Sequence, residues 1–287
     1  MILITGGSGF VGRSLLHRLQ QKEREFKVYD GRINDPMHLR QELEGVEIVF
    51  HLAGAEARGR AHLVQHVDVE GTERLLEESE RAGVQYLILL SRIGADPNSL
   101  YPLLRAKGQA ERRIERSGIP YTIVRSASLF GIEDRFLNVI ASLAAWSWPF
   151  VWLPGGGRVV LQPLWVVDLV RCLEMVLDRP DLRNETVVVA GEEQMRYREL
   201  ARMVVEAADL RRIPLKVDLR LVRPLARLTM GWWPRPPVTR FFMDRFSVPE
   251  VAPVDSVLHS FGFRPGRLGD HIAYLRRPGL RRRLFRL

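Results

Sequence analysis

Short apolar runs alternate with amphipathic stretches from the start of the chain to about residue 190. The runs have the length of buried strands and lie at residues 2–4, 26–29, 46–52, 86–90, 121–124 and 186–189. Apolar residues at helical spacing occupy the intervals, at residues 12–19, 36–43, 70–82, 103–117 and 169–177. Strands that alternate with helices in this way predict an α/β fold with a doubly wound parallel sheet.

The pattern loosens in the second half of the chain. Gly83 and Gly118 suit the C-caps of two predicted helices, and Asp168 is predicted to be the N-cap of helix 169–177. One more helical pattern covers 197–208, and residues 211–287 are then rich in Arg, Pro and Trp. We therefore expect two domains. They are a nucleotide-binding domain at 1–190, in which 131–160 contributes to the cleft, and a smaller basic C-terminal lobe and tail at 191–287.

Residues 136–157 contain no charged side chain, and a stretch of this length could cross a bilayer. Asn138, Pro149 and the Gly155–Gly157 run interrupt this stretch, so a helix followed by a loop over the substrate cleft is the favoured interpretation. The alternative is a lipid-facing set of tryptophans beside the arginines, made of Trp146, Trp148, Trp152, Trp232 and Trp233.

Composition narrows the class of protein. The 287 residues are 46% hydrophobic, which is enough to bury a sizeable core. The single cysteine, Cys172, excludes a disulfide framework and a cysteine-based zinc site. No metal site is predicted. Because the first predicted strand begins at Met1, we expect no signal peptide before it and a cytoplasmic protein.

The positive charge is confined to the last quarter of the chain. Residues 211–287 hold 17 Lys/Arg against 5 Asp/Glu, a net charge of +12, whereas the other residues sum to −3. The last twelve residues, from Arg276, carry six arginines. This asymmetry indicates an anionic partner, such as the inner face of a membrane or a membrane protein complex, or else a solvated tail. Nucleic acid is the less favoured partner because no recognition motif supports it.

Glycines with dinucleotide-loop spacing follow the first strand. Gly6 permits the tight turn, Gly9 lets the backbone approach a pyrophosphate, and Gly12 lets helix and strand pack closely. The helix that begins here offers unpaired N–H groups and the positive end of its dipole to the phosphates. The sequence therefore predicts a Rossmann-type domain that binds NAD(H) or NADP(H).

An acidic residue ends the second predicted strand. Asp30 follows Gly12 at close to the spacing, about 20 residues, at which a carboxylate bonds the adenosine ribose and favours NAD. Arg13 and Arg32 stand nearby and could instead pair with the 2′-phosphate of NADP. An unusually short segment separates Asp30 from the strand at Val46, so Asp30 as a simple turn cap is the third possibility.

Several motifs resemble the extended and atypical short-chain dehydrogenase/reductase superfamily, the epimerase/dehydratase-like proteins. Thr5–Gly12 looks like its TGGxGFxG motif, and His51–Gly54 looks like the motif that lines the adenosine side. Asp68-Val-Glu-Gly-Thr72 resembles its N-x-x-G-T helix start, with Asp in the Asn position, and Ser91 stands where the superfamily keeps a catalytic Ser or Thr. Loop and resemblance together imply cofactor contacts at Gly6, Ser8, Gly9, Phe10, Val11, Gly12, Arg13, Asp30, Arg32, Ile33, Leu52, Ala53, Gly54, Ser91, Lys107 and Ser126.

A narrower likeness extends over nearly the whole chain. Residues 130–138, 161–168 and 197–200 are similar to the atypical group that includes the nucleotide-binding accessory subunit of respiratory complex I and its bacterial homologues. That resemblance implies a bound NAD(H) or NADP(H), little or no turnover and often a membrane-associated setting.

The catalytic helix departs from the superfamily's Tyr-x-x-x-Lys pair. The candidate catalytic residues are Ser91, Tyr101 and Lys107, but Leu103 occupies the tyrosine position four residues before the lysine. Tyr101 precedes Lys107 by six residues. At ~100° per residue this is one full turn plus about 240° around the helix axis, so Tyr101 would lie on a different face of a helix from Lys107. Pro102 could begin the helix and leave Tyr101 in an entry turn that still reaches the site.

Two functions follow as the main hypotheses. The first is a dinucleotide-binding protein with a degraded catalytic pair and a structural or assembly role at a membrane or membrane complex. The second is an active NAD(P)-dependent reductase or epimerase of a small carbonyl or nucleotide-sugar substrate. A nucleic-acid-binding or redox-sensing regulator is a third hypothesis.

Overall fold

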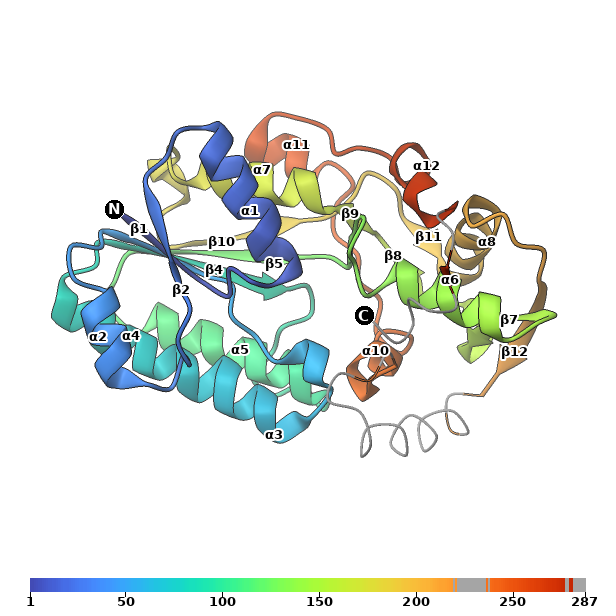
Figure 1. Cartoon of the computed structure of the whole chain (residues 1–287), viewed down its shortest axis with the longest axis horizontal. Coiled ribbons are helices and arrows are strands. Elements are labelled where there is room, and N and C mark those ends of the chain that lie inside the picture. The colour runs from blue at the N-terminus through green and yellow to red at the C-terminus, as the bar shows by residue number, and fades with distance from the viewer. Residues whose placement is uncertain (219, 221–235, 237, 277–278, 281–287) are drawn as a thin grey trace. The chain divides into compact units, whose positions relative to one another are not determined.

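The computed structural model describes residues 1–218, 220, 236, 238–276, 279 and 280, which form two compact units (Figure 1). The first unit comprises Met1–Glu56, Arg60–Ser126 and Val167–Val189. The second comprises Ala57–Gly59, Ala127–Val166 and the described residues of Ala190–Leu287. Residues 131–160, which we expected within a domain at 1–190, therefore group with the second unit.

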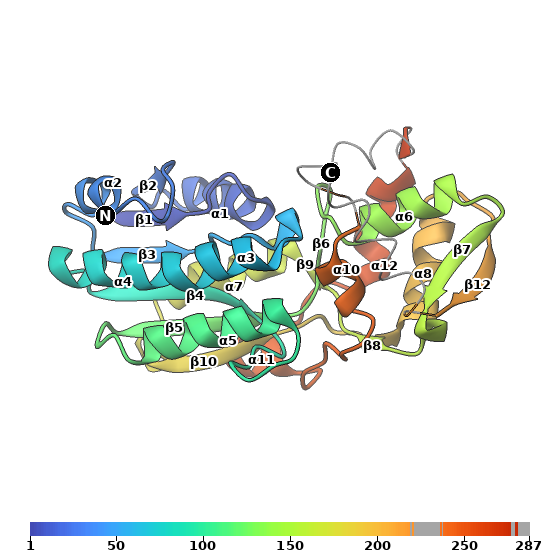
Figure 2. The ribbon, with the colours of Figure 1, turned by 90° about the horizontal axis from the view of Figure 1, so that it is seen from below.

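A six-stranded parallel sheet forms the first unit and confirms the predicted α/β class. Its order is β10-β5-β4-β3-β1-β2, which Figure 2 shows from one edge to the other. All five strand pairs are parallel. The strands are β1 (Ile2–Thr5), β2 (Phe26–Tyr29), β3 (Ile48–His51), β4 (Tyr86–Arg92), β5 (Tyr121–Ser126) and β10 (Glu185–Val189).

The short segment after Asp30 determines one side of this sheet. It holds a single helix, α2 (Pro36–Glu42), which the side chain of Asp35 caps by accepting the His38 N–H. The chain then returns to the other side of β1, where β3 pairs with it. The strand order consequently reverses between β1 and β3, and ligands of open α/β sheets bind outside the carboxyl ends of strands at such a point.

Helices cover both faces of the sheet. Helices α1 (Phe10–Gln21) and α7 (Val166–Val176) lie on one face, joined by the Arg18–Glu174 ion pair at 3.2 Å (Figure 1). Helices α4 (Gly71–Ala82) and α5 (Pro102–Glu115) lie on the other face, with α2 packed against α4 (Figure 1). The shorter elements are η1 (Glu56–Arg58), α3 (Ala61–Val64), the π-helical turn η2 (Gln65–Glu70) and η4 (Pro180–Leu182).

Asp168 is not the N-cap that the sequence suggested. Helix α7 begins two residues earlier, at Val166, directly after a short strand that ends at Trp165. No turn separates the two elements, so Asp168 lies within the first helical turn. A carboxylate there still stabilises the positive end of the helix dipole, which explains why the residue has the appearance of a cap.

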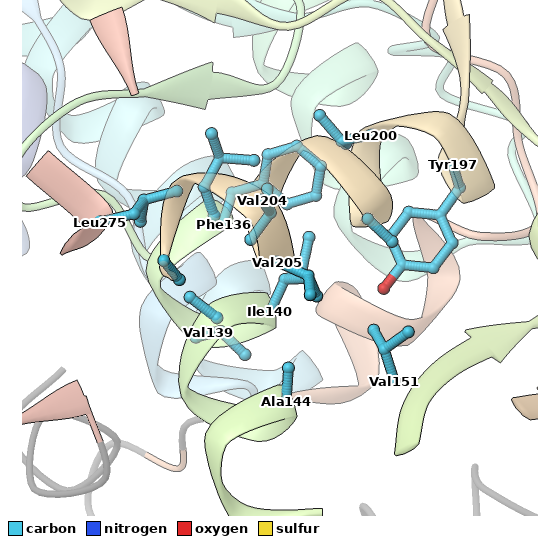
Figure 3. Close-up of a cluster of buried hydrophobic side chains, with 14 of the residues drawn as sticks. Phe136, Val139, Ile140, Ala144, Val151, Tyr197, Leu200, Val204, Val205 and Leu275 are labelled. Atoms are coloured by element: carbon cyan, nitrogen blue, oxygen red, sulfur yellow. The ribbon is translucent and has the colours of Figure 1, made fainter. Parts of the chain in front are cut away.

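The second unit packs around α6 (Leu137–Trp146) and α8 (Tyr197–Ala207), the latter as predicted for 197–208. Figure 3 shows Phe136, Ile140 and Ala144 facing Tyr197, Val204 and Val205 in its core. Its remaining elements are β6 (Leu129–Phe130), β7 (Phe150–Pro154), η3 (Gly155–Gly157), β8 (Val160–Leu161), β9 (Leu164–Trp165), β11 (Met195–Arg196), β12 (Ile213–Val217), α10 (Arg240–Asp244), α11 (Ser256–Phe261), α12 (Leu268–His271) and η5 (Ala273–Arg276).

The uncharged stretch 136–157 forms a helix and a strand rather than a helix and a loop. It contains α6, then β7, which pairs in parallel with β12, and then η3. The correction arises because β7 finds its partner far along the chain, beyond α7 and α8, which no local pattern reveals. Within the part of the chain that is described, no helix has the length and apolar character needed to cross a membrane. Trp232, Trp233 and most of the terminal arginines lie outside the described residues.

Candidate dinucleotide site

The glycine loop forms the strand–turn–helix geometry that the sequence predicts. Gly6 has a φ of 73°, and its carbonyl accepts the Gly9 N–H at 3.0 Å. Gly9 is then the N-cap of α1, with its carbonyl accepting the Arg13 N–H at 2.9 Å. A Cβ at Gly12 would stand 2.4 Å from the Gly6 carbonyl oxygen, so only glycine allows the first turn of α1 to approach the loop.

The loop lies against the segment that follows β3, at the reversal of strand order. The Leu52 N–H donates to the Thr5 carbonyl at 3.1 Å, and a Cβ at Gly6 would come within 2.6 Å of the Ala53 nitrogen. This brings Gly6, Leu52 and Ala53 together as expected for two walls of one nucleotide site. Their contact with a nucleotide remains a prediction.

The groups expected to read the adenosine ribose lie beyond the end of β2. The Asp30 side chain is 88% exposed, and its carboxylate lies 3.5 Å from His38 Nε2. Arg32 is also exposed, whereas Ile33 is buried and would meet a Cβ placed on Gly71. Asp30 and Arg32 are therefore both accessible to a ligand.

Arg13 folds back on the glycine loop. Its guanidinium donates to the Ser8 carbonyl, which places a positive charge beside the predicted phosphate position. Ser8 is exposed, and Phe10 and Val11 are half-buried at the start of α1. These positions agree with the expected phosphate end of the site without testing it.

Ser91 and Ser126 lie side by side near the carboxyl ends of β4 and β5. Ser126 Oγ donates to the Ser91 carbonyl at 3.3 Å, and both side chains are buried. Ser91 Oγ has no hydrogen-bond partner among the described residues, although it is buried. A buried hydroxyl in this position is costly unless a ligand or water satisfies it.

Lys107 is held by a buried carboxylate. Its Nζ lies 2.8 Å from Asp68 Oδ1, while Asp68 Oδ2 accepts the Ala55 N–H at 2.9 Å. Asp68 lies in the π-helical turn η2, and turns of this kind redirect side chains inside helices, often at functional sites. Gly54 completes the contact, because a Cβ there would stand 3.1 Å from Asp68 Oδ1.

The tyrosine expected of a catalytic pair is absent from the helix face that carries Lys107. Leu103 is buried within α5, in the position that precedes the lysine by one helical turn. Pro102 begins α5, and Tyr101 is its half-buried N-cap, as the entry-turn hypothesis supposed. Tyr101 therefore precedes the helix instead of lying on its surface.

Sequence reasoning missed a buried polar chain beneath the glycine loop. His51 Nδ1 lies 2.7 Å from Thr5 Oγ1, and His51 Nε2 lies 2.9 Å from Thr72 Oγ1. Because Thr72 Oγ1 donates to the Asp68 carbonyl at 2.6 Å, it accepts from Nε2, and Nδ1 accepts from Thr5. This series of hydrogen bonds joins the end of β1 to the start of α4 through a neutral imidazole. The motif His51–Gly54 was the available signal for it.

Burial and, to a smaller extent, the nearby Lys107 charge lower the pKa of His51 to about 3. Above pH 6.5, the ordinary pKa of histidine, the ring is neutral in both the folded and the unfolded chain. As the pH falls below this value the unfolded chain takes up a proton that the folded chain refuses, so the free energy of unfolding decreases.

We predict that His51 removes about 2 kcal/mol of unfolding free energy between pH 7 and pH 5. Denaturant unfolding at the two pH values measures this loss, with His51→Gln as the comparison. The variant is less stable at pH 7 but loses about 2 kcal/mol less than the parent on acidification. Equal losses in the two proteins would show that His51 is not the responsible group.

The motifs of the narrower resemblance build the second unit. Asp134, in the 130–138 motif, accepts backbone N–H groups of Gly131, Phe136 and Leu137, and Tyr274 Oη donates to it at 2.6 Å. Burial raises the pKa of Asp134, while these donors oppose the shift. Gln162, in the 161–168 motif, donates to the Gly191 carbonyl and accepts the Ala252 N–H. These residues organise loops and the start of α6.

No metal centre is evident in the described ranges. His62 and His66 stand four residues apart, but His66 pairs with Glu70 at 2.7 Å. Across the residues that can be placed, no three His, Cys, Asp or Glu side chains gather as metal ligands would.

Comparison with known proteins agrees with this geometry. Residues 13–135 match the family of NAD(P)H-binding domains. These residues therefore form an NAD(P)H-binding domain. The NAD(P)-binding domain that the glycine and His51–Gly54 motifs predicted is thereby confirmed.

Two curated relatives share most of the chain. One is the NADH-ubiquinone oxidoreductase 40 kDa subunit of Neurospora crassa, 24% identical over 86% of this chain and 72% of the relative. The other is NADH dehydrogenase [ubiquinone] 1 alpha subcomplex subunit 9 of Mus musculus, 25% identical over 91% of this chain and 76% of the relative. They confirm the predicted, distant relationship to complex I accessory subunits.

A solved structure confirms the fold over nearly the full length. The complex of MoeE5 with UDP-glucose and NAD superposes with a TM-score of 0.74, covering 96% of each chain at 20% identity. At this identity the likeness establishes the fold alone.

Proposed function

We propose that this protein holds NAD(H) or NADP(H) without catalytic turnover and has a structural or assembly role at a membrane or a membrane complex. The bound dinucleotide stabilises the first unit, because a ligand that binds only the folded chain raises its stability. The glycine loop supplies the pyrophosphate site, and Asp30 favours NAD(H) over NADP(H) at the ribose.

The engagement of Lys107 is the observation that carries the proposal. In the superfamily's chemistry the lysine lowers the pKa of a tyrosine one turn before it, so that the tyrosine exchanges a proton with substrate. Here the corresponding position holds buried Leu103, and the lysine is paired with Asp68 at 2.8 Å. The proton-transfer pair is missing while the nucleotide loop keeps its geometry.

The assembly role draws on the relatives and on charge. One relative is named as a subunit of NADH-ubiquinone oxidoreductase and the other as a subunit of NADH dehydrogenase [ubiquinone]. The net charge of +12 on residues 211–287 suits docking on an anionic surface.

An activity assay of the purified chain tests the absence of turnover. NADH and NADPH are each incubated with the protein and a panel of small aldehydes and ketones, and absorbance at the nicotinamide band is followed. UDP-sugars are incubated with NAD⁺ and the protein, and their epimers are separated by chromatography, because epimerisation consumes no dinucleotide. We expect no oxidation beyond the rate without protein. Turnover near ordinary enzyme rates of about 1–1000 per second would contradict the proposal.

Ser91 supports a second candidate, an active reductase or epimerase of a small carbonyl or nucleotide sugar. Its buried Oγ has no partner among the described residues, which leaves a donor for a substrate oxygen, and Tyr101 would then supply the proton. In that case Tyr101→Phe abolishes whatever activity the panel reveals.

A further inference from the structure

Large apolar side chains are exposed together in the second unit, where β7 and β12 pair. Trp148 is 74% exposed, Ile213 58% and Leu215 40%. Monomeric proteins rarely leave neighbouring large apolar groups in water unless the surface binds something. We call Trp148, Phe150, Trp152, Ile213 and Leu215 the β7–β12 surface.

Hydrogen bonds show that these residues are neighbours. The parallel register pairs Ile213 with Phe150 and Leu215 with Trp152, so their side chains share one face of the two-stranded sheet. Trp148 is adjacent, because the Ile213 N–H donates to the carbonyl of Pro149 at 2.8 Å. Figure 1 shows β7 and β12 side by side.

The opposite face of β7 packs into the hydrophobic core of the second unit. Val151 and Leu153 alternate with Phe150 and Trp152 along the strand and are buried in the cluster of the second unit. Phe150 and Trp152 are only partly buried. Packing of the unit therefore explains the inner face of β7 but leaves the exposed side chains of the β7–β12 surface in water.

The charges around this surface are predominantly positive. Arg211 is exposed two residues before Ile213, whereas Lys216 is exposed on the face of β12 opposite to Ile213 and Leu215. Of the acidic neighbours, Asp209 lies 3.6 Å from Arg276, whereas Asp218 accepts the backbone N–H of Arg220 and keeps its charge. In the sequence, five arginines and no acidic residue follow Asp218 before Asp244.

Tryptophans and aliphatic side chains flanked by Lys and Arg are the composition of surfaces that lie in the interface of an anionic membrane. We propose that the β7–β12 surface seats in the headgroup region of an anionic bilayer. Trp148, Ile213 and Leu215 insert at the level of the headgroups, while Arg211 contacts lipid phosphates. This inference deepens the membrane role proposed above, but it does not depend on nucleotide binding.

Vesicle flotation of the full-length chain tests the inference. Vesicles of equal parts phosphatidylcholine and phosphatidylglycerol are compared with vesicles of phosphatidylcholine alone. We expect the chain to float with the anionic vesicles and to be released as salt rises, because the phosphate contacts are screened. The triple variant Trp148→Ser/Ile213→Ser/Leu215→Ser should bind them at least about tenfold more weakly.

A matched control removes exposed apolar side chains elsewhere. Met37 and Leu100 are 68% and 91% exposed in the first unit, and Met37→Ser/Leu100→Ser should float as the parent does. Denaturant unfolding of each variant verifies its folding, and nucleotide titration tests the proposed nucleotide role separately from membrane binding. A failure of the proposed nucleotide role would therefore be seen in that titration and not in the flotation.

Three results would overturn the inference. One is a parent chain that floats with neither kind of vesicle. Another is equal flotation of the triple variant and the control, which would transfer membrane binding to the basic C-terminal sequence. The third is a concentration-dependent dimer that the triple variant abolishes in sedimentation, which would assign the surface to a second copy of the chain instead.

Discussion

A Gly12→Ala variant is expected to bind NAD(H) and NADP(H) about 100-fold more weakly than the parent. The added Cβ would stand 2.4 Å from the Gly6 carbonyl oxygen and 2.6 Å from Gly7 Cα. Both are backbone atoms that cannot rotate away. Helix α1 must therefore move outward, and its N–H groups leave the pyrophosphate position. Equilibrium titration with each dinucleotide measures the loss.

Two further glycines frame this experiment. Gly9→Ala places its Cβ 3.2 Å from the Gly6 carbonyl oxygen, a milder contact that should give a smaller loss if Gly12→Ala proves too unstable to study. Gly269→Ala is the matched control, because its Cβ would meet only Met203 Cε at 3.8 Å. Full affinity in Gly12→Ala would show that the loop does not hold the nucleotide.

Breaking the Asp68–Lys107 pair should produce the largest loss of stability. Asp68 is 1% exposed and Lys107 13%, so Asp68→Asn or Lys107→Met leaves a largely buried partner without its counter-charge, which typically costs about 3–5 kcal/mol. The double variant Asp68→Asn/Lys107→Met should recover part of this loss, because no uncompensated charge remains. Denaturant unfolding of the four proteins gives the coupling energy.

The same variants distinguish a structural lysine from a cofactor-binding one. If Lys107 is held by Asp68, as we propose, Lys107→Met reduces stability far more than it reduces dinucleotide affinity. Arg202→Gln is a suitable control, because the exposed Arg202–Glu206 pair should contribute little. Additive losses in the double variant would mean that Asp68 and Lys107 do not interact.

Local patterns predicted most of the first unit. The glycine turn, the strands and the helices depend on residues close in sequence, and the short segment after Asp30 has room for α2 alone. Asp168 was wrongly predicted as the N-cap of α7, because a carboxylate is favourable both at the N-cap and in the first turn of a helix.

Contacts between segments that are distant in the sequence could not be predicted from local patterns. The Asp68–Lys107 pair joins two helices, and the π-helical turn that directs Asp68 has no spacing signature in the sequence. In the sequence, His51 is recognisable only as part of the His51–Gly54 motif. Its hydrogen bonds with Thr5 and Thr72 become evident only from its buried position in the structure. The pairing of β7 with β12 likewise depends on a register between strands that α7 and α8 separate in the sequence.

Equilibrium titration of the purified parent chain with NAD⁺, NADH, NADP⁺ and NADPH tests the central claim most directly. The account predicts saturable binding at one site per chain, with NAD(H) bound more tightly than NADP(H) because the exposed Asp30 carboxylate repels a 2′-phosphate. Absence of saturable binding for all four dinucleotides would contradict it.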